Sequence, residues 1–120
     1  MYGLSRDLDL SFLSGRQVTH VTIAVYQIAF GFDEDLAISV HSQFGYFDGH
    51  DEWVWTPEPG GAHIAARTVA LLDSTIESFQ GHEDGTLKLI FSNGQRLTIL
   101  DNSRAYESYD ITWRGPTIVV

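Results

Sequence analysis

The sequence predicts an α+β fold dominated by antiparallel strands: a half-open roll built from two related hairpin units, with one short helix packed on the sheet. Three observations support this prediction. Apolar residues alternate with polar ones over much of the chain, short polar turns separate the alternating segments, and one alanine-rich stretch has helical spacing instead. With 120 residues the chain can bury a sizeable core, and we expect a single domain over residues 1–120.

The first hairpin unit covers about residues 18–40. Apolar residues alternate up to Phe32 and again from Leu36, on either side of Asp33-Glu34-Asp35. Cross-strand partners must share a face of the sheet. This condition is met only if all three acidic residues form the loop, so the sequence predicts a three-residue turn.

The second unit covers about residues 76–99. A two-residue Asn93-Gly94 turn would put its two apolar sets on opposite faces, whereas a three-residue loop over 92–94 pairs Leu89 with Leu97 and gives Gly94 the positive φ of a bulged turn. A shift of 59 positions (30 to 89) superposes the two units, which we interpret as a weak internal repeat. Convergence is the alternative, because any two hairpins share a period of two.

The other elements follow from local pattern. We expect an edge strand or extended arm over residues 8–12, a loop over 41–61 with a short strand at 53–55, a helix over 62–72, and final strands over 107–113 and 117–120.

Charge and composition limit the possible partners. Sixteen acidic and seven basic residues give a net charge of −9, which argues against nucleic acid or an anionic membrane and favours a basic protein or a cation. The absence of cysteine excludes disulfides, thiolate metal sites and a cysteine nucleophile. With no signal peptide or membrane span in the pattern, we expect a cytoplasmic protein.

Acidic residues gather at turns, and two tryptophans share one face of a short strand. If the turns lie at one end of the molecule, they form a negative rim for a basic partner, with the tryptophans as anchors; the alternative for both tryptophans is the core. The predicted partner-binding residues are Asp33, Glu34, Asp35, Asp48, Asp51, Glu52, Trp53 and Trp55.

Other chemistry has weaker support. The segment 48–52 holds potential metal ligands, including His50, but matches no ligand spacing, so we expect a solvated loop and neither metal nor cofactor. Glu107 could serve as a general acid, although pairing with backbone donors, Arg96 or Arg104 is the more frequent arrangement. No catalytic motif is present, so we assign no catalytic residues and do not expect an enzyme.

Two pairs of stretches, 10–18 with 26–35 and 83–97 with 106–111, resemble a family of small uncharacterised bacterial proteins over about residues 8–120. Some small acidic bacterial proteins of this size are immunity proteins. The leading hypothesis is therefore a non-catalytic, immunity-type module that neutralises a basic toxin, such as a nuclease, by occlusion with an acidic surface. The alternatives are a structural protein that forms a homodimer through its sheet edges, and a small-molecule binder with a cavity in the roll.

Overall fold

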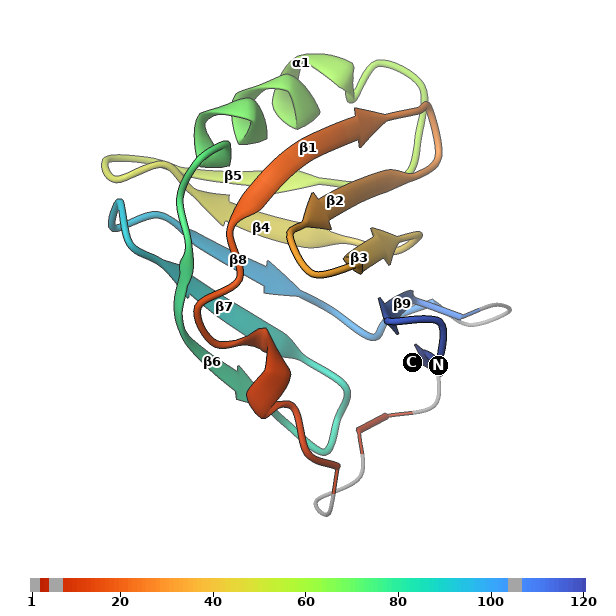
Figure 1. Ribbon diagram of the computed structural model, residues 1–120. Helices are drawn as coiled ribbons and strands as arrows, with labels where there is room; N and C mark the ends of the chain where they lie inside the picture. The colour runs from red at the N-terminus through yellow and green to blue at the C-terminus, as the bar shows by residue number, and fades with distance from the viewer. Residues whose placement is uncertain (1–2, 5–7, 104–106) are drawn as a thin grey trace.

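The computed structural model describes residues 3–4, 8–103 and 107–120. Within these ranges, ten strands form two five-stranded antiparallel sheets, accompanied by one short α-helix (Figure 1). This confirms the predicted α+β fold with mainly antiparallel strands.

The strand order defines the two sheets. The first sheet consists of β1 (Val18–Ile23), β2 (Ile28–Phe32), β3 (Leu36–Val40), β9 (Tyr109–Trp113) and β10 (Thr117–Val119), in that order. The second consists of β5 (Glu52–Trp55), β4 (Phe44–Phe47), β8 (Arg96–Ile99), β7 (Leu87–Phe91) and β6 (Ile76–Gly81). Each hairpin unit therefore lies in its own sheet. The hairpin β9–β10, which follows the second unit in the chain, completes the first sheet, and the hairpin β4–β5, which follows the first unit, completes the second.

The hairpin registers agree with the phase of the apolar residues. Phe30 lies opposite Ile38 and Leu89 opposite Leu97, as the three-residue loops require. Both units also have an irregularity near the start of their first strand, after Val18 in β1 and after Ile76 in β6.

The two sheets meet where β1 and β6 begin, through hydrogen bonds that are repeated in both halves. The N–H of Val18 donates to the carbonyl of Ser74 at 2.9 Å, and the N–H of Ile76 donates to the carbonyl of Arg16 at 2.9 Å. Each bond is the counterpart of the other under the internal repeat, so the halves are related by a pseudo-two-fold arrangement at this junction.

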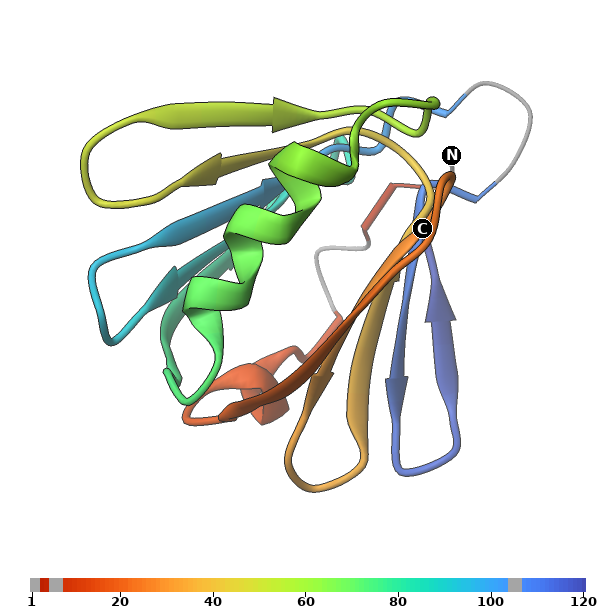
Figure 2. The same ribbon diagram turned by 90° about the horizontal axis from the view of Figure 1, so that it is seen from above.

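The helix covers one open end between the sheets. It consists of α1 (Ala62–Ala65) continued by a 3-10 helix (Ala66–Leu71), close to the predicted range of 62–72. It contacts β5 of one sheet and β1 of the other, as Figure 2 shows from above. This position explains the burial of Ala65, Thr68 and Leu71 in an otherwise exposed segment.

Two local predictions are wrong. The segment 41–61, predicted as a loop with a strand only at 53–55, also contains β4, which is stabilised by its pairing with β5 and β8. The edge strand, one of the two alternatives for residues 8–12, does not form. A 3-10 turn (Ser11–Leu13) occupies this region, because the carboxylate of Asp9 accepts a hydrogen bond from the N–H of Ser11 at 2.9 Å and bends the chain. Leu10 and Leu13 are nevertheless buried in the core.

The core lies between the inner faces of the sheets. Phe30 of the first sheet meets Phe44 of the second edge to face, with ring centroids 5.9 Å apart, and Phe44 stacks on Trp55 at 5.3 Å. The contact between Phe30 and Phe44 joins the two sheets into one core.

Candidate functional site

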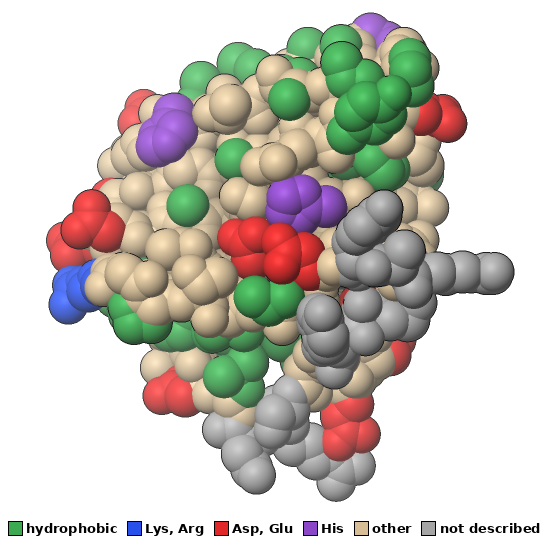
Figure 3. All heavy atoms as spheres, turned by 90° about the vertical axis from the view of Figure 1, so that its right-hand side faces the viewer, with side chains coloured by type: hydrophobic (Ala, Val, Ile, Leu, Met, Phe, Trp, Pro, Cys, Tyr) green, Lys and Arg blue, Asp and Glu red, His purple; other side chains and the backbone are tan. Residues whose placement is uncertain are grey.

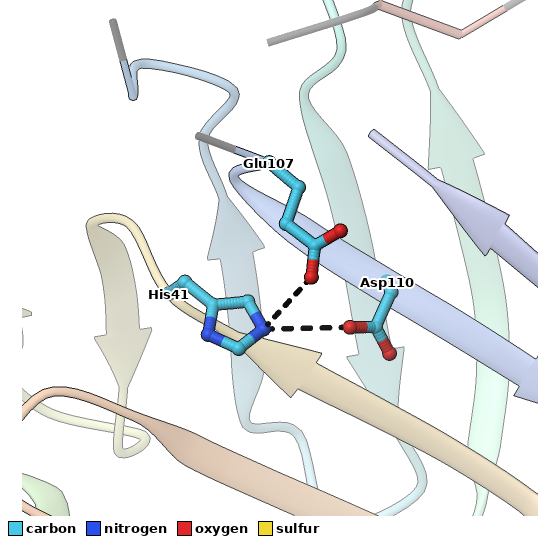
Figure 4. A group of neighbouring side chains, drawn as sticks. All are labelled: His41, Glu107 and Asp110. Atoms are coloured by element: carbon cyan, nitrogen blue, oxygen red, sulfur yellow. Dashed lines mark hydrogen bonds and ion pairs between the residues drawn. The ribbon is translucent and has the colours of Figure 1, made fainter. Parts of the chain in front are cut away.

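The outer face of the first sheet has a cluster of three ionisable side chains, His41, Glu107 and Asp110. Nε2 of His41 lies 3.5 Å from Oε1 of Glu107 and 3.4 Å from Oδ2 of Asp110 (Figure 4). All three side chains are partly exposed, with 28%, 38% and 19% of their surface accessible. The cluster can therefore contact both solvent and a bound molecule.

The backbone of adjacent strands positions this cluster. His41 directly follows β3, Asp110 lies within β9, and these two strands pair with Ser39 opposite Asp110. The N–H of His41 donates to the carbonyl of Ser108 at 2.8 Å, which extends the pairing past the end of β3. Glu107 precedes β9, so its side chain does not follow the inward alternation of that strand.

Small side chains cover the rest of this face. Gly31 pairs with Ala37, which in turn pairs with Thr112, and Ala29 pairs with Ser39. We call this surface the docking face and define it by Ala29, Ala37, Ser39 and Thr112. Figure 3 shows the side of the molecule where histidine and acidic side chains lie together. The centre of the face therefore has only short side chains on β3, while the imidazole of His20 on β1 lies over the buried Gly31 on β2.

The acidic turn, residues 33–35, lies at the opposite end of β3 from the cluster. Glu34 and Asp35 both have φ of 59°, and the N–H of Leu36 donates to the carbonyl of Asp33 at 3.3 Å. Two consecutive residues with positive φ are typical of a type I′ turn, which favours Asn-Gly. The exposed Glu34 also accepts a hydrogen bond from Arg114 at 2.9 Å.

Asp48 organises the turn between β4 and β5. Its carboxylate accepts hydrogen bonds from the N–H groups of His50 and Asp51, each at 2.8 Å, and from Nε1 of Trp53 at 3.0 Å. The backbone bond from Asp51, followed by those from His50 and Trp53, lowers the pKa of Asp48 to about 2. Asp48 thus has a local structural role.

The two predicted tryptophan anchors differ in exposure. Trp55 is 1% exposed and belongs to the core, so its side chain is not accessible to a partner. Trp53 is partly exposed, but the guanidinium of Arg67 lies 3.6 Å from the centre of its ring. Glu52, beside it, lies 3.6 Å from Arg96.

The acidic turns do not form one rim. Figure 2 shows the turn between β2 and β3 and the turn between β4 and β5 pointing in different directions. Asp33, Glu34 and Asp35 therefore belong to the end of the first sheet, while Asp48, Asp51 and Glu52 belong to the second. The docking face adjoins only the first group.

The described arginine side chains contact aromatic rings of the same chain. Each arginine in the described ranges lies over an aromatic ring: Arg16 and Arg114 over Trp113, Arg67 over Trp53, and Arg96 over Phe47. Such contacts hold the guanidinium groups against the chain's own surface.

The sequence pointed to Glu107 but not to its neighbours. Glu107 lies beside His41 rather than beside Arg96, and Arg104 is outside the described residues. It faces outward and does not line a cavity between the sheets; a hollow of about 300 Å³ lies instead between Leu4, Leu10 and Phe79. His41 and Asp110 were missed because only the pairing of β3 with β9 brings them together. The internal repeat could have drawn attention to His41, because it aligns this histidine with the apolar Leu100 of the second copy.

The model of DUF6188, a family of unknown function, matches residues 10–120 of the chain. The chain belongs to this family. No curated protein and no solved structure is similar enough to match. The DUF6188 assignment agrees with the resemblance to uncharacterised proteins and assigns no activity to the cluster or the docking face.

Among the described residues, no helix has the length and apolar character needed to span a membrane.

Proposed function

We propose that this protein is a non-catalytic module that binds a basic protein across the docking face and the acidic turn. The observation that carries the proposal is the charge distribution: the chain has a net charge of −9, while its described arginines are held on its own aromatic rings. Opposite charge accelerates association and selects partners.

The docking face supplies the geometry for such a partner. Carboxylates lie at both ends of β3, in the acidic turn and in Glu107 and Asp110. The six steps from Asp35 to His41 correspond to about 20 Å along an extended chain. Ala37 and Ser39 on β3 are small, so a partner could approach this strand closely beside the His20 ring, which lies over Gly31. A partner with two groups of lysine or arginine side chains at this separation would be complementary to the carboxylates at the two ends of β3.

A toxin that acts on nucleic acid would have such a basic surface, because these proteins contact phosphates through lysine and arginine. By covering those residues the module would block access of the nucleic acid, as an immunity protein does. The proposal keeps the cytoplasm as the compartment and assigns the chain no catalytic step.

The direct experiment is affinity capture from a lysate of the native host, followed by measurement of binding to the captured basic protein. The variant Glu34→Asn/Asp35→Gly removes two charges from the acidic turn and keeps a type I′ sequence. The control Glu58→Gln/Glu77→Gln removes two charges from exposed positions outside the first sheet.

We expect the turn variant to weaken binding on the order of 10-fold or more, and the control to change it much less. High salt should also slow association of the wild-type protein. A captured partner that binds equally well to both variants, at low and high salt, would contradict the proposal.

A homodimer through the sheet edges is the second candidate. Val54 on β5 and Val119 on β10 are 52% and 42% exposed on edge strands of the two sheets. Unpaired edges can extend a sheet into a second copy. Light scattering of the purified chain distinguishes a dimer, which would support this candidate, from a monomer.

A further inference from the structure

We propose that His41, Glu107 and Asp110 form a binding site for a first-row divalent metal ion, with Zn²⁺ the best fit. Each residue offers one ligand atom, and these atoms lie within 4.8 Å of one another. This inference departs from the sequence-based expectation of no metal. A bound ion would occupy Glu107 and Asp110, two of the carboxylates that the proposed function offers to a basic partner, and would leave the acidic turn free.

The distances in the cluster match a tetrahedral ion. Zinc binds nitrogen and oxygen ligands at about 2.0–2.2 Å, so two ligands at a tetrahedral angle are separated by about 3.4 Å. Nε2 of His41 lies 3.4 Å and 3.5 Å from the nearest oxygens of Asp110 and Glu107. These separations exceed the length of a strong charge-assisted hydrogen bond, about 2.7–2.9 Å. The oxygens of Glu107 and Asp110 lie within 4.8 Å of each other, so one ion could contact all three atoms after a rearrangement of the side chains.

Strand pairing positions the ligands, although only Asp110 lies within a strand, while His41 directly follows β3 and Glu107 precedes β9. His41 and Asp110 are held by the pairing of β3 with β9, and the bond from His41 N–H to the Ser108 carbonyl fixes the segment between Glu107 and Asp110. The potential ligands in the turn 48–52 differ, because Asp48 already accepts three hydrogen bonds there. Preorganised ligands reduce the conformational cost of binding.

The internal repeat shows that the fold does not require this cluster. The bond from His41 to Ser108 has a counterpart from Leu100 to Gln43 at 3.0 Å, and the Ser39–Asp110 pair has a counterpart in Thr98–Gly45. Where one half has a histidine and an aspartate, the other has leucine and glycine. The same backbone is thus built without the ionisable groups.

The ligand types favour a transition metal. Imidazole suits zinc, copper, iron and nickel, whereas calcium takes six to eight oxygen ligands and magnesium prefers oxygen and water. Two carboxylates balance the charge of a divalent ion. Because the side chains are partly exposed, a fourth position is accessible to water or to a donor atom of a bound molecule.

Isothermal titration of the tag-free full chain with Zn²⁺ alone tests the proposal. We expect one ion per chain, and a loss of affinity on the order of 100-fold or more in His41→Leu and in Asp110→Asn, since even residues that only support a ligand contribute about 10- to 100-fold. His41→Leu places at this position the residue found at its counterpart, Leu100. His63→Ala is the control, because His63 is exposed on α1 and hydrogen-bonded to Gly60.

A second readout is thermal unfolding with and without Zn²⁺. The ion should raise the melting temperature of the wild type and the control but not of the two ligand variants, because a ligand stabilises only the state that binds it. Equal Zn²⁺ binding by the wild type, His41→Leu and Asp110→Asn would overturn the proposal, as would binding lost equally in His63→Ala, which would indicate adventitious binding to surface histidines. Neither readout requires a protein partner, so this result is separable from that for the proposed function.

Discussion

Asp33 and Gln17 exchange two hydrogen bonds: the N–H of Asp33 donates to the Gln17 carbonyl at 3.0 Å, and the Asp33 carboxylate accepts from the N–H of Gln17 at 3.0 Å. In the other half, Ser92 and Thr75 make the corresponding pair, with the Ser92 hydroxyl accepting from the N–H of Thr75 at 3.0 Å. Asp33 therefore supports the junction between the sheets, in addition to its place in the acidic turn.

The first prediction concerns this junction. Asp33→Ala removes the acceptor for a backbone N–H and should lower the free energy of unfolding by about 1–2 kcal/mol. Asp33→Ser should lose less, because serine makes the same contact at position 92. Urea denaturation of the two variants checks this. Equal losses in both would show that the side-chain acceptor does not matter.

The second prediction concerns Tyr109. Its hydroxyl donates to the carbonyl of Gly85 at 2.6 Å, and burial raises its pKa well above the ordinary value. The unfolded chain therefore loses this proton first, so the contribution of Tyr109 is complete below about pH 10 and declines as the pH rises above it. Stability should fall more steeply between about pH 9 and 11 in the wild type than in Tyr109→Phe.

Tyr26→Phe is the matched control, because Tyr26 is 61% exposed. It should leave the alkaline slope of the wild type unchanged. If Tyr109→Phe also leaves that slope unchanged, the buried hydroxyl is not responsible for it.

The third prediction concerns Asp48, whose pKa is lowered to about 2 by its three hydrogen bonds. Because the folded pKa is below the ordinary value of about 3.9, the stabilisation is present above about pH 4 and is lost as the pH falls towards 2. The stability advantage of the wild type over Asp48→Ala should narrow across this interval. An NMR titration that returns an ordinary aspartate pKa would contradict this interpretation.

The fourth prediction concerns backbone strain in the acidic turn. A positive φ at a residue other than glycine costs about 1–2 kcal/mol, less for asparagine and aspartate. Glu34→Asn/Asp35→Gly should therefore raise the free energy of unfolding by about 1 kcal/mol, although it removes the exposed pair with Arg114, which contributes little. Thermal and urea denaturation both measure this. A less stable variant would show that the contact with Arg114 outweighs the strain.

The sequence predicts most of the local structure, but it misses β4 and does not determine the arrangement of the sheets. The period of two and the position of Gly94 determined the hairpin registers, because both depend on neighbouring residues. The assignment of β4 to the second sheet depends on the pairing of Phe44 with Ile99, which no local pattern indicates. The two hairpin units were consequently placed together in one roll, whereas they belong to two sheets.

Only the part of the candidate site that is contiguous in the sequence could be predicted. The acidic turn could be found because its charges are consecutive. The cluster could not, since His41 and Asp110 meet only through the pairing of β3 with β9. Trp53 and Trp55 have the same parity, but only the second is fully buried, because β5 is an edge strand and Trp53 lies nearer its outer end, under Arg67.

The central claim, that the acidic turn and docking face bind a basic protein, is tested most directly by measuring the affinity of the captured partner for Glu34→Asn/Asp35→Gly. This variant separates binding from folding, because it should be more stable than the wild type and yet bind more weakly. The account predicts a dissociation constant raised on the order of 10-fold or more, with little change in Glu58→Gln/Glu77→Gln. An unchanged dissociation constant in the more stable turn variant would contradict it.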